Sequence, residues 1–155
     1  MLNIVLVEPE IPQNTGNIIR SCAATGTTLH LVRPLGFSFD DKHLKRSGLD
    51  YHDLANIKFY DSFDEVVKNN PEGKFFFSTT KVNQSHSDVK FVENSFIVFG
   101  KETKGLPKEI IENNLETCIR IPMIDDERAR SLNLSNSVAI VLYEALRQLK
   151  YPNMK

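Results

Sequence analysis

Short apolar runs alternate with segments of helical periodicity along the whole of this 155-residue chain. The apolar runs, rich in β-branched and aromatic residues, cover residues 2–7, 28–32, 57–60, 74–79, 95–99 and 118–121. Helices are expected over about residues 14–25, 40–48, 62–68 and 107–112, and a last one follows residue 131. Such alternation is typical of domains in which helices cover a mostly parallel sheet. The sequence therefore predicts an α/β fold with a mostly parallel sheet flanked by helices.

The size and composition of the chain are those of an ordinary globular protein. A length of 155 residues suits one domain, and no repeat, low-complexity tract or linker divides residues 1–155. No apolar run approaches the roughly 20 residues that a membrane span needs. The first residues also lack the basic segment and cleavage site of a signal peptide. A single cytoplasmic domain without membrane contact is therefore expected.

Cysteine, histidine and net charge limit the classes of function. Cys22 and Cys118 lie in apolar runs and suit buried, reduced thiols. The four histidines show no metal-ligand spacing, so no metal site is expected. A formal charge of −1 disfavours binding of nucleic acid through bulk electrostatics and leaves room only for local basic patches. Such patches are candidates at residues 42–46, at Lys101 with Lys104, and at Arg128 with Arg130, although each taken singly also fits ordinary solvated surface.

The start of the last helix is unusually polar. Five Ser and Asn residues surround two leucines between Ser131 and Ser137, directly before the most regular apolar face in the chain. That face consists of Leu134, Val138, Val141, Leu142, Ala145 and Leu149. One Ser or Asn is enough to cap a helix. The surplus indicates either a bound polar ligand or a loop that happens to be rich in small polar residues.

Three polar loops follow predicted strands, at residues 8–20, 100–107 and 122–136. In parallel sheets, ligands bind outside the carboxyl ends of the strands. Gly100 and Gly105 have the spacing of the first half of a P-loop, but Leu106 and Pro107 replace its lysine and hydroxyl residue. No G-x-G-x-x-G sequence follows any strand either. A P-loop nucleotide hydrolase and a Rossmann oxidoreductase are therefore both disfavoured.

The first of these loops carries two notable side chains. Asn14 stands where a helix N-cap is expected. Arg20 follows six residues later, in a helix whose neighbouring residues Ile19 and Cys22 are apolar. A charge among buried neighbours requires a partner or an anionic ligand. Arg20 is therefore a candidate for anion binding.

Taken together and in order, the three loops resemble the three motifs of the SPOUT-class RNA 2′-O-methyltransferases. The matching stretches are 14–20 (NTGNIIR), 99–107 (FGKETKGLP), 121–123 (IPM) and 130–136 (RSLNLSN). Residues 44–52 and 143–148 further resemble the small enzymes of this class that methylate the wobble nucleotide, cytidine or uridine 34, of tRNA. The resemblance implies a C-terminal trefoil knot that holds S-adenosylmethionine, and an obligate homodimer. The loop 123–129 is about two residues longer than this branch leads one to expect, so either Arg128 or Arg130 could be the arginine of the third motif.

The resemblance also implies roles for individual residues. The cofactor site would comprise Ser78, Thr79, Gly100, Glu102, Gly105, Ile121, Ser131, Leu132 and Leu134. The catalytic group would comprise Arg20, Asn14, Asn133 and Ser135. Because a guanidinium does not lose its proton in proteins, Arg20 is expected to act as an electrostatic clamp on a phosphate and on the developing alkoxide.

A groove built from both subunits is expected to bind tRNA. Its candidate residues are Lys42, Lys45, Arg46, Lys101, Lys104, Tyr143 and Arg147. Tyr143 could equally pack at a contact between helices of the dimer. Alternative functions are methylation of ribosomal RNA, RNA binding without catalysis, and small-molecule chemistry on an α/β scaffold. The first is disfavoured because many enzymes of this class that act on ribosomal RNA carry an RNA-binding extension before the residues that correspond to Met1.

Overall fold

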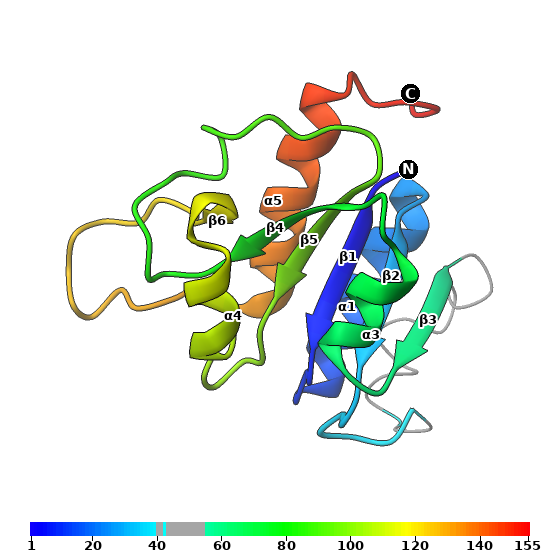
Figure 1. Cartoon of the computed structure of the whole chain (residues 1–155), viewed down its shortest axis with the longest axis horizontal. Coiled ribbons are helices and arrows are strands. Elements are labelled where there is room, and N and C mark those ends of the chain that lie inside the picture. Colours follow the sequence, from blue (N-terminus) through cyan, green and yellow to red (C-terminus); the bar gives the residue numbers. More distant parts are fainter. Residues whose placement is uncertain (40–41, 43–54) are drawn as a thin grey trace.

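A six-stranded parallel sheet forms the centre of the protein. The computed structural model describes residues 1–39, 42 and 55–155. The strands are β1 (Asn3–Val7), β2 (Thr28–Val32), β3 (Asn56–Tyr60), β4 (Lys74–Ser78), β5 (Ser95–Phe99) and β6 (Cys118–Ile119). Their order across the sheet is β3-β2-β1-β5-β4-β6, and every pairing is parallel (Figure 1). The predicted α/β fold is confirmed.

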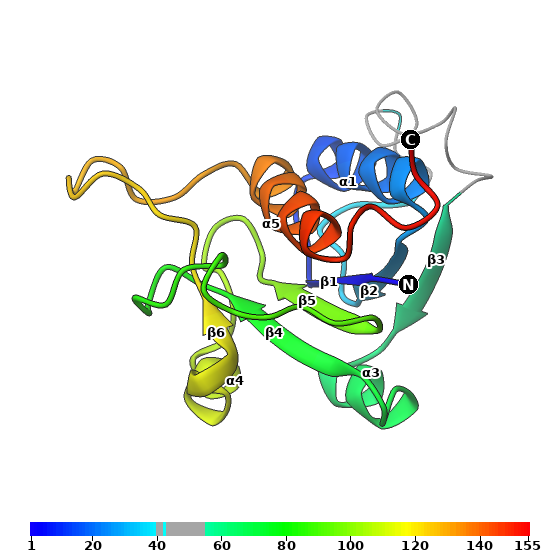
Figure 2. The same ribbon diagram turned by 90° about the horizontal axis from the view of Figure 1, so that it is seen from above.

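Helices cover both faces of this sheet. They are α1 (Pro12–Thr25), α3 (Phe63–Asn69), α4 (Lys108–Asn113) and α5 (Leu134–Gln148), with a short 3-10 helix at Leu115–Thr117. Helices α1 and α5 lie side by side on one face, and α3 and α4 lie on the other (Figure 2). The helix expected over residues 40–48 falls outside the part of the chain that the structure describes.

The sheet separates two hydrophobic clusters. Along β1, Ile4 and Leu6 point to the side of α1 and α5, whereas Val5 and Val7 belong to the cluster on the side of α3 and α4. All residues of β1, β2 and β5 are buried, as expected for parallel strands covered on both faces. Each buried Val or Leu contributes roughly 1.5–3 kcal/mol. The two layers together hold the carboxyl ends of β1, β4 and β5 at one edge of the sheet.

Several predicted boundaries are confirmed and others are wrong. Gly26 ends α1 in the left-handed region with φ 67°, and the Ser62 side chain caps α3 by accepting a hydrogen bond from the Glu65 amide. Helix α1 begins at Pro12, however, so Asn14 is a buried residue within the helix rather than its cap. Helix α5 begins at Leu134 and is capped by Asn133. Part of the polar surplus before α5 is therefore a helix cap.

Strand β6 is shorter than predicted because its continuation pairs with a loop. The Thr79 amide donates to the Ile119 carbonyl (2.9 Å) on one side. On the other side the Arg120 amide donates to the Gln84 carbonyl (2.8 Å), and the His86 amide donates to the Arg120 carbonyl (2.8 Å). The loop after β4 thus runs around the chain at residues 119–120 and contacts it from two sides. A threaded chain needs such an enclosure, and the trefoil knot itself stays a prediction.

His30 makes the stability of the fold dependent on pH. The ring is buried, with Nδ1 2.8 Å from the Tyr60 hydroxyl and Nε2 2.9 Å from Asn3 Oδ1. Burial, and secondarily the positive charge of Lys58, lowers the pKa of His30 from 6.5 to about 4. Because the unfolded chain binds this proton more readily, stability is full above pH 6.5 and falls as the pH drops towards 4. We expect urea unfolding to show about 2 kcal/mol lost between pH 7 and pH 5 through this group.

The pH dependence of two histidine variants isolates this effect. His30→Gln should reduce the difference in unfolding free energy between pH 7 and pH 5, even though it lowers stability at both values. His86→Gln, on the half-exposed loop after β4, should leave that difference as in the unmodified protein. An unchanged pH dependence in His30→Gln would show that other groups cause it.

Candidate functional site

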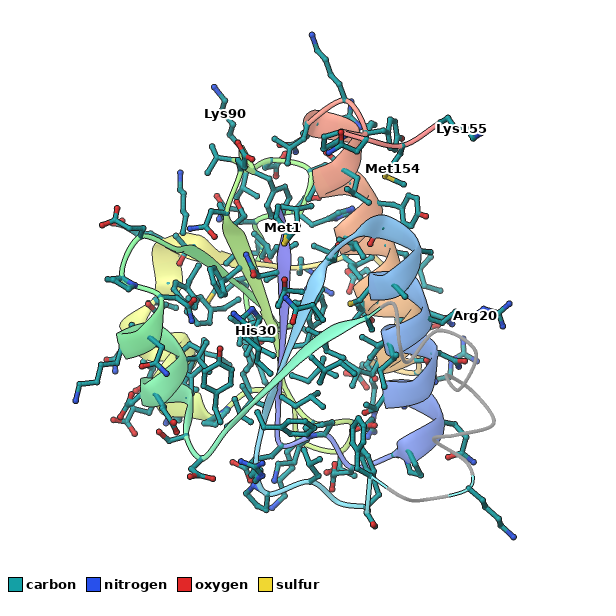
Figure 3. The ribbon with its side chains drawn as sticks, turned by 90° about the vertical axis from the view of Figure 1, so that its right-hand side faces the viewer. Met1, Arg20, His30, Lys90, Met154 and Lys155 are labelled. Carbon is teal, nitrogen blue, oxygen red and sulfur yellow. The ribbon has the colours of Figure 1, made fainter. Side chains whose placement is uncertain are left out.

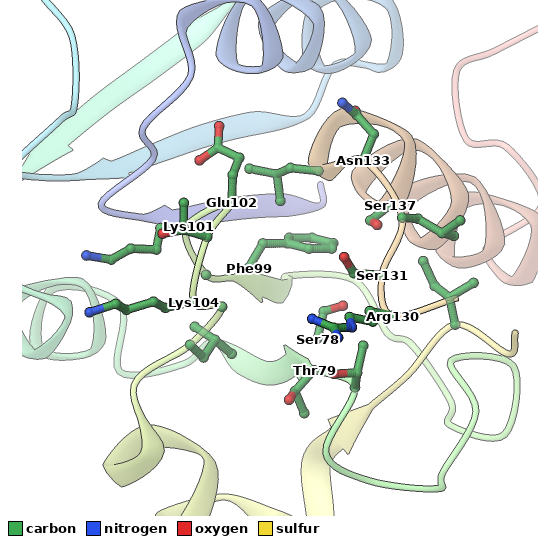
Figure 4. Close-up of a pocket in the computed structure, with 18 of the residues that line it drawn as sticks. Ser78, Thr79, Phe99, Lys101, Glu102, Lys104, Arg130, Ser131, Asn133 and Ser137 are labelled. Carbon is green, nitrogen blue, oxygen red and sulfur yellow. The ribbon is translucent and has the colours of Figure 1, made fainter. Parts of the chain in front are cut away.

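A pocket of about 540 Å³ opens at the carboxyl ends of β4 and β5, next to the segment that follows β6. Most of its walls come from three parts of the chain, residues 78–81, 99–106 and 121–134 (Figure 4), and Ile11, Asn14, Ile111 and Ser137 complete them. This volume lies in the range of small-molecule sites, about 300–1,000 Å³. All nine residues predicted for the cofactor lie along these walls. Their role in binding stays a prediction.

The wall formed by residues 100–105 has a shape that two glycines require. The Gly105 amide donates to the Lys101 carbonyl (2.9 Å), which closes the loop into a tight turn. Gly105 has φ 68°, in the left-handed region that favours glycine. A Cβ atom on Gly100 would lie 2.0 Å from the Gly105 carbonyl carbon, so no larger residue fits there without movement of the backbone. The glycine spacing therefore serves this turn rather than a P-loop.

The pocket combines an apolar interior with a polar and basic rim. Apolar side chains come from Phe99 at the end of β5, from Leu106 and Ile111, and from the third loop. Four lining residues lie outside the motif stretches that the sequence singled out for a cofactor: Ile11, Thr80, Lys81 and Ile111. Lys81 could have been found from its position shortly after the end of a strand. The neighbouring strand ends at Phe99, and such positions meet at one edge of a parallel sheet.

The residues predicted for catalysis are only partly brought together. Asn14 and Asn133 both line the pocket, and the side-chain amide of Asn133 donates to Asn14 Oδ1 (3.0 Å). Ser135 does not line it; its hydroxyl donates to Asn133 Oδ1 (2.6 Å). Asn133 Oδ1 also accepts the Ser135 and Asn136 amides and so caps α5. Asn133 therefore links the pocket wall to the start of α5.

Arg20 lies elsewhere. It is absent from the pocket wall, and its side chain projects outward from α1 (Figure 3). Ile19 and Cys22 are buried as expected, but the Arg20 side chain itself is exposed, so burial does not require an anionic ligand there. Helix periodicity explains the difference, because Ile18, Ile19 and Cys22 face the core while position 20 falls on the opposite side of α1.

The two arginines of the long third loop have different surroundings. Arg128 binds Asp126 through Nη2 (2.6 Å) and Nε (3.0 Å), and its amide also donates to the same carboxylate (2.9 Å). The side-chain and backbone hydrogen bonds from Arg128 hold the pKa of Asp126 below its usual range. Arg130, by contrast, lines the pocket beside Ser131 (Figure 4). Of the two arginines, Arg130 is the one that can contact a pocket ligand.

The predicted RNA contacts are distributed over two regions. Lys101 and Lys104 stand at the pocket, and Lys81 and Arg130 add two further basic groups there. Tyr143 is 43% exposed on α5. Arg147 on the same helix pairs with Glu144 (3.0 Å), and this pairing lowers the pKa of Glu144. Lys42 is exposed, whereas Lys45 and Arg46 lie outside the described residues.

Residues 1–39, 42 and 55–155 hold no group of three or more His, Cys, Asp or Glu side chains that could bind a metal ion. The helices of this part of the chain are also too short or too polar to cross a membrane.

Sequence comparison places the chain in a known family. The SpoU rRNA methylase family matches residues 1–143. A Bacillus subtilis relative is 55% identical over 99% of this chain and 97% of its own. Relatives from Photorhabdus asymbiotica and Escherichia coli are 54% and 49% identical over 97% and 98% of this chain and 96% of theirs, and both are named tRNA (cytidine(34)-2′-O)-methyltransferase.

Solved structures agree with the sequence comparison. One described as giving insight into the 2′-OH methylation of C/U34 on tRNA is 41% identical and superposes with a TM-score of 0.91 over 97% of both chains. A SpoU methyltransferase from Streptomyces viridochromogenes in complex with AdoMet is 25% identical, with a TM-score of 0.84 over 97% of this chain and 61% of that one. The family match covers all six strands of the sheet and the pocket walls. The chain belongs to the SpoU rRNA methylase family.

Proposed function

We propose that residues 1–155 form one methyltransferase domain that methylates the ribose 2′-hydroxyl of the wobble nucleotide, cytidine or modified uridine 34, of tRNA. The observation that carries the proposal is the identity of about 50%, over almost the full length of both chains, to relatives named for this reaction at cytidine 34. The pocket gives further support, because it lies at the carboxyl ends of the strands, where parallel sheets bind ligands. A role in tRNA modification further suggests a cytoplasmic location.

The pocket fits S-adenosylmethionine in size and chemistry. A bound cofactor of this kind supplies a methyl group already activated by a sulfonium. The apolar interior suits an adenine ring, and the tight turn at Gly100 and Gly105 lets backbone groups approach a ligand closely. Hydroxyl and backbone groups at Ser78, Thr79 and Ser131 can bind the polar parts. A SpoU methyltransferase of the same fold binds AdoMet, which supports this assignment.

The protein must also orient the ribose and assist departure of its proton. A fixed positive charge can hold the adjacent phosphate and stabilise the alkoxide that develops on the 2′-oxygen. Arg20 is our candidate for this charge, and Asn133 would orient the ribose or the cofactor. Because Arg20 projects away from the pocket of its own chain, the proposal further requires that RNA or a second copy bring the two together.

A homodimer would supply that second copy. Ile140 and Tyr143 lie on one face of α5 at a spacing of three residues and are 39% and 43% exposed. Apolar surface of this kind on a long helix suits a contact between copies. The basic groups of each pocket, Lys81, Lys101, Lys104 and Arg130, would then provide the local positive field that a chain of net charge −1 otherwise lacks.

A direct experiment tests the function. Purified protein is incubated with S-adenosylmethionine and tRNA from a strain that lacks the gene, and new 2′-O-methyl groups are mapped by mass spectrometry. We expect methylation at nucleotide 34 and none on tRNA that already carries the modification. Ribosomal RNA serves as a parallel substrate. Methylation of ribosomal RNA alone, or failure to bind the cofactor, would contradict the proposal.

A further inference from the structure

Helix α1 lacks an N-cap of its own. The residue at the cap position is Ile11, whose side chain cannot accept a hydrogen bond, and Pro12 follows it. The first amides of a helix need acceptors from elsewhere. Glu102, in the loop that forms the pocket wall, supplies acceptors for the cap residue and for the residue before it. Its two carboxylate oxygens accept the Glu10 amide (2.8 Å) and the Ile11 amide (2.9 Å).

The contact between these two segments is reciprocal. The Glu10 carboxylate accepts both the amide (3.0 Å) and the hydroxyl (2.8 Å) of Thr103, and these bonds lower the pKa of Glu10. Lys101 pairs with Glu8 (3.6 Å), a non-glycine residue with φ 56°. Three successive loop residues thus each bind the segment that leads into α1. We refer to residues 8–11 and 101–103 together as the clamp.

The clamp continues to α5 through two asparagines. The Asn14 side-chain amide donates to Glu102 Oε2 (3.2 Å), and Asn14 Oδ1 accepts from the Asn133 side chain (3.0 Å). Asn133 in turn caps α5. The side chains of Glu102, Asn14 and Asn133 therefore connect the three motif-bearing segments of the chain. In Figure 4 the Glu102 carboxylate points towards α1 and away from the interior of the pocket.

We propose that Glu102 is a positioning residue that ties the cofactor-binding loop to the N-terminus of α1, so that a ligand in this loop orders the helix that carries Arg20. The proposal rests on the proposed function for the identity of the ligand and goes beyond it in the role of Glu102. Both oxygens of this carboxylate already accept hydrogen bonds from Glu10, Ile11 and Asn14. We therefore expect a direct hydrogen bond from Glu102 to the cofactor to contribute less than these three.

The electrostatics of the site favour the same role. Negative charge is stabilised at the N-terminus of a helix, where the amides are unpaired and the helix dipole is positive. A carboxylate directed into the pocket would instead weaken the field of Lys101, Lys104 and Arg130, which line the same pocket. Binding of Glu102 by α1 keeps its charge away from an approaching phosphate. Coupling between loop and helix is reciprocal, so ordering of either one stabilises the other.

Glu102→Gln tests the proposal. The Glu10 and Ile11 amides bind different oxygens of the Glu102 carboxylate, and a glutamine replaces one of these oxygens by an NH2 group, so one of the two amides would face a donor and the other would bind a neutral oxygen. We expect amide hydrogen exchange at these two residues to accelerate about tenfold or more, since bonds to charged groups are the stronger ones. S-adenosylhomocysteine should slow this exchange in the unmodified protein but not in the variant. Its affinity should change less than about threefold, while kcat for tRNA falls about tenfold with little change in KM.

A matched control and a second variant complete the test. Glu109→Gln makes the same chemical change at an exposed position of α4 and should alter none of these values. Thr103→Val removes one bond to the Glu10 carboxylate and should accelerate exchange of the α1 segment to a smaller extent, which keeps the test open if Glu102→Gln fails to fold.

The outcomes separate this proposal from the proposed function. Unchanged exchange at Glu10 and Ile11 together with about tenfold weaker binding of S-adenosylhomocysteine would overturn the positioning role and make Glu102 a ligand contact. Absence of tRNA methylation in the unmodified protein would contradict the proposed function alone, because the exchange measurements need no RNA. Unchanged exchange in the ligand-free variant would overturn the clamp whether or not the protein binds the cofactor.

Discussion

Replacement of Arg20 by alanine should reduce turnover on tRNA about 10²–10³-fold, the usual effect of removing one preorganised group that stabilises developing charge. Cofactor binding should remain close to that of the unmodified protein, because Arg20 is absent from the pocket wall. The fold should also be retained, since the side chain is exposed on α1. Single-turnover methylation and calorimetric titration with S-adenosylhomocysteine measure the two quantities separately.

The exposed Arg33 provides a control for loss of one positive charge. It pairs with Asp61 (3.2 Å) and lies over the Phe59 ring, at the ends of β2 and β3, which β1 separates from the pocket strands β5 and β4. Arg33→Ala should therefore methylate tRNA at nearly the normal rate. Full activity of Arg20→Ala would remove Arg20 from the mechanism. Equal losses in both variants would instead indicate a general effect of charge on RNA binding.

Gly100→Ala is expected to weaken cofactor binding by a steric route. The added Cβ would lie 2.0 Å from the Gly105 carbonyl carbon and 2.1 Å from the Leu106 amide nitrogen, so the backbone of the loop must move. Overpacking of this kind costs about 1–3 kcal/mol. If the unbound loop relaxes and the ligand must restore its shape, affinity for S-adenosylhomocysteine falls about ten- to hundredfold. Calorimetric titration measures this loss directly.

Gly26→Ala is the matched control for this substitution. Gly26 ends α1 with φ 67°, and a Cβ there would meet no atom within 4 Å. The variant should lose stability, by roughly 1–2 kcal/mol, because a side chain disfavours the left-handed conformation. Its affinity for S-adenosylhomocysteine should be normal. If Gly100→Ala binds S-adenosylhomocysteine normally and its melting temperature is not lowered, the loop tolerates a side chain at this position and the steric argument fails.

Local physical chemistry explains why much of the fold was predictable. Apolar runs that lack strict alternation favour strands buried on both faces, and β1 and β5 are such strands. Gly26 and Ser62 end and begin helices through interactions within a few residues. The turn closed by Gly105 and the cap of α5 by Asn133 likewise form within a few residues. These features depend on neighbours in the sequence.

The candidate site shows where such reasoning stops. Asparagine is a common helix cap, yet α1 begins before Asn14. The Asn14 side chain instead forms hydrogen bonds with Glu102 and Asn133, which lie on distant loops. The choice between Arg128 and Arg130 was open because the loop 123–129 is about two residues longer than the resemblance leads one to expect. It depends on the path of the third loop, in which Asp126 engages Arg128 and leaves Arg130 at the pocket.

The sequence by itself determined the strands and most of the helices of this α/β fold, and the ordered motifs that place the chain in its family. Hydrophobic periodicity and local capping are sufficient for the first, and residue identity for the second. Only the tertiary structure decided that Arg20 lies away from the pocket, that Glu102 binds the segment before α1, and that Ile119 and Arg120 are enclosed by the loop after β4. These results depend on contacts between segments far apart in the chain, and such contacts form only when the layers pack on the sheet.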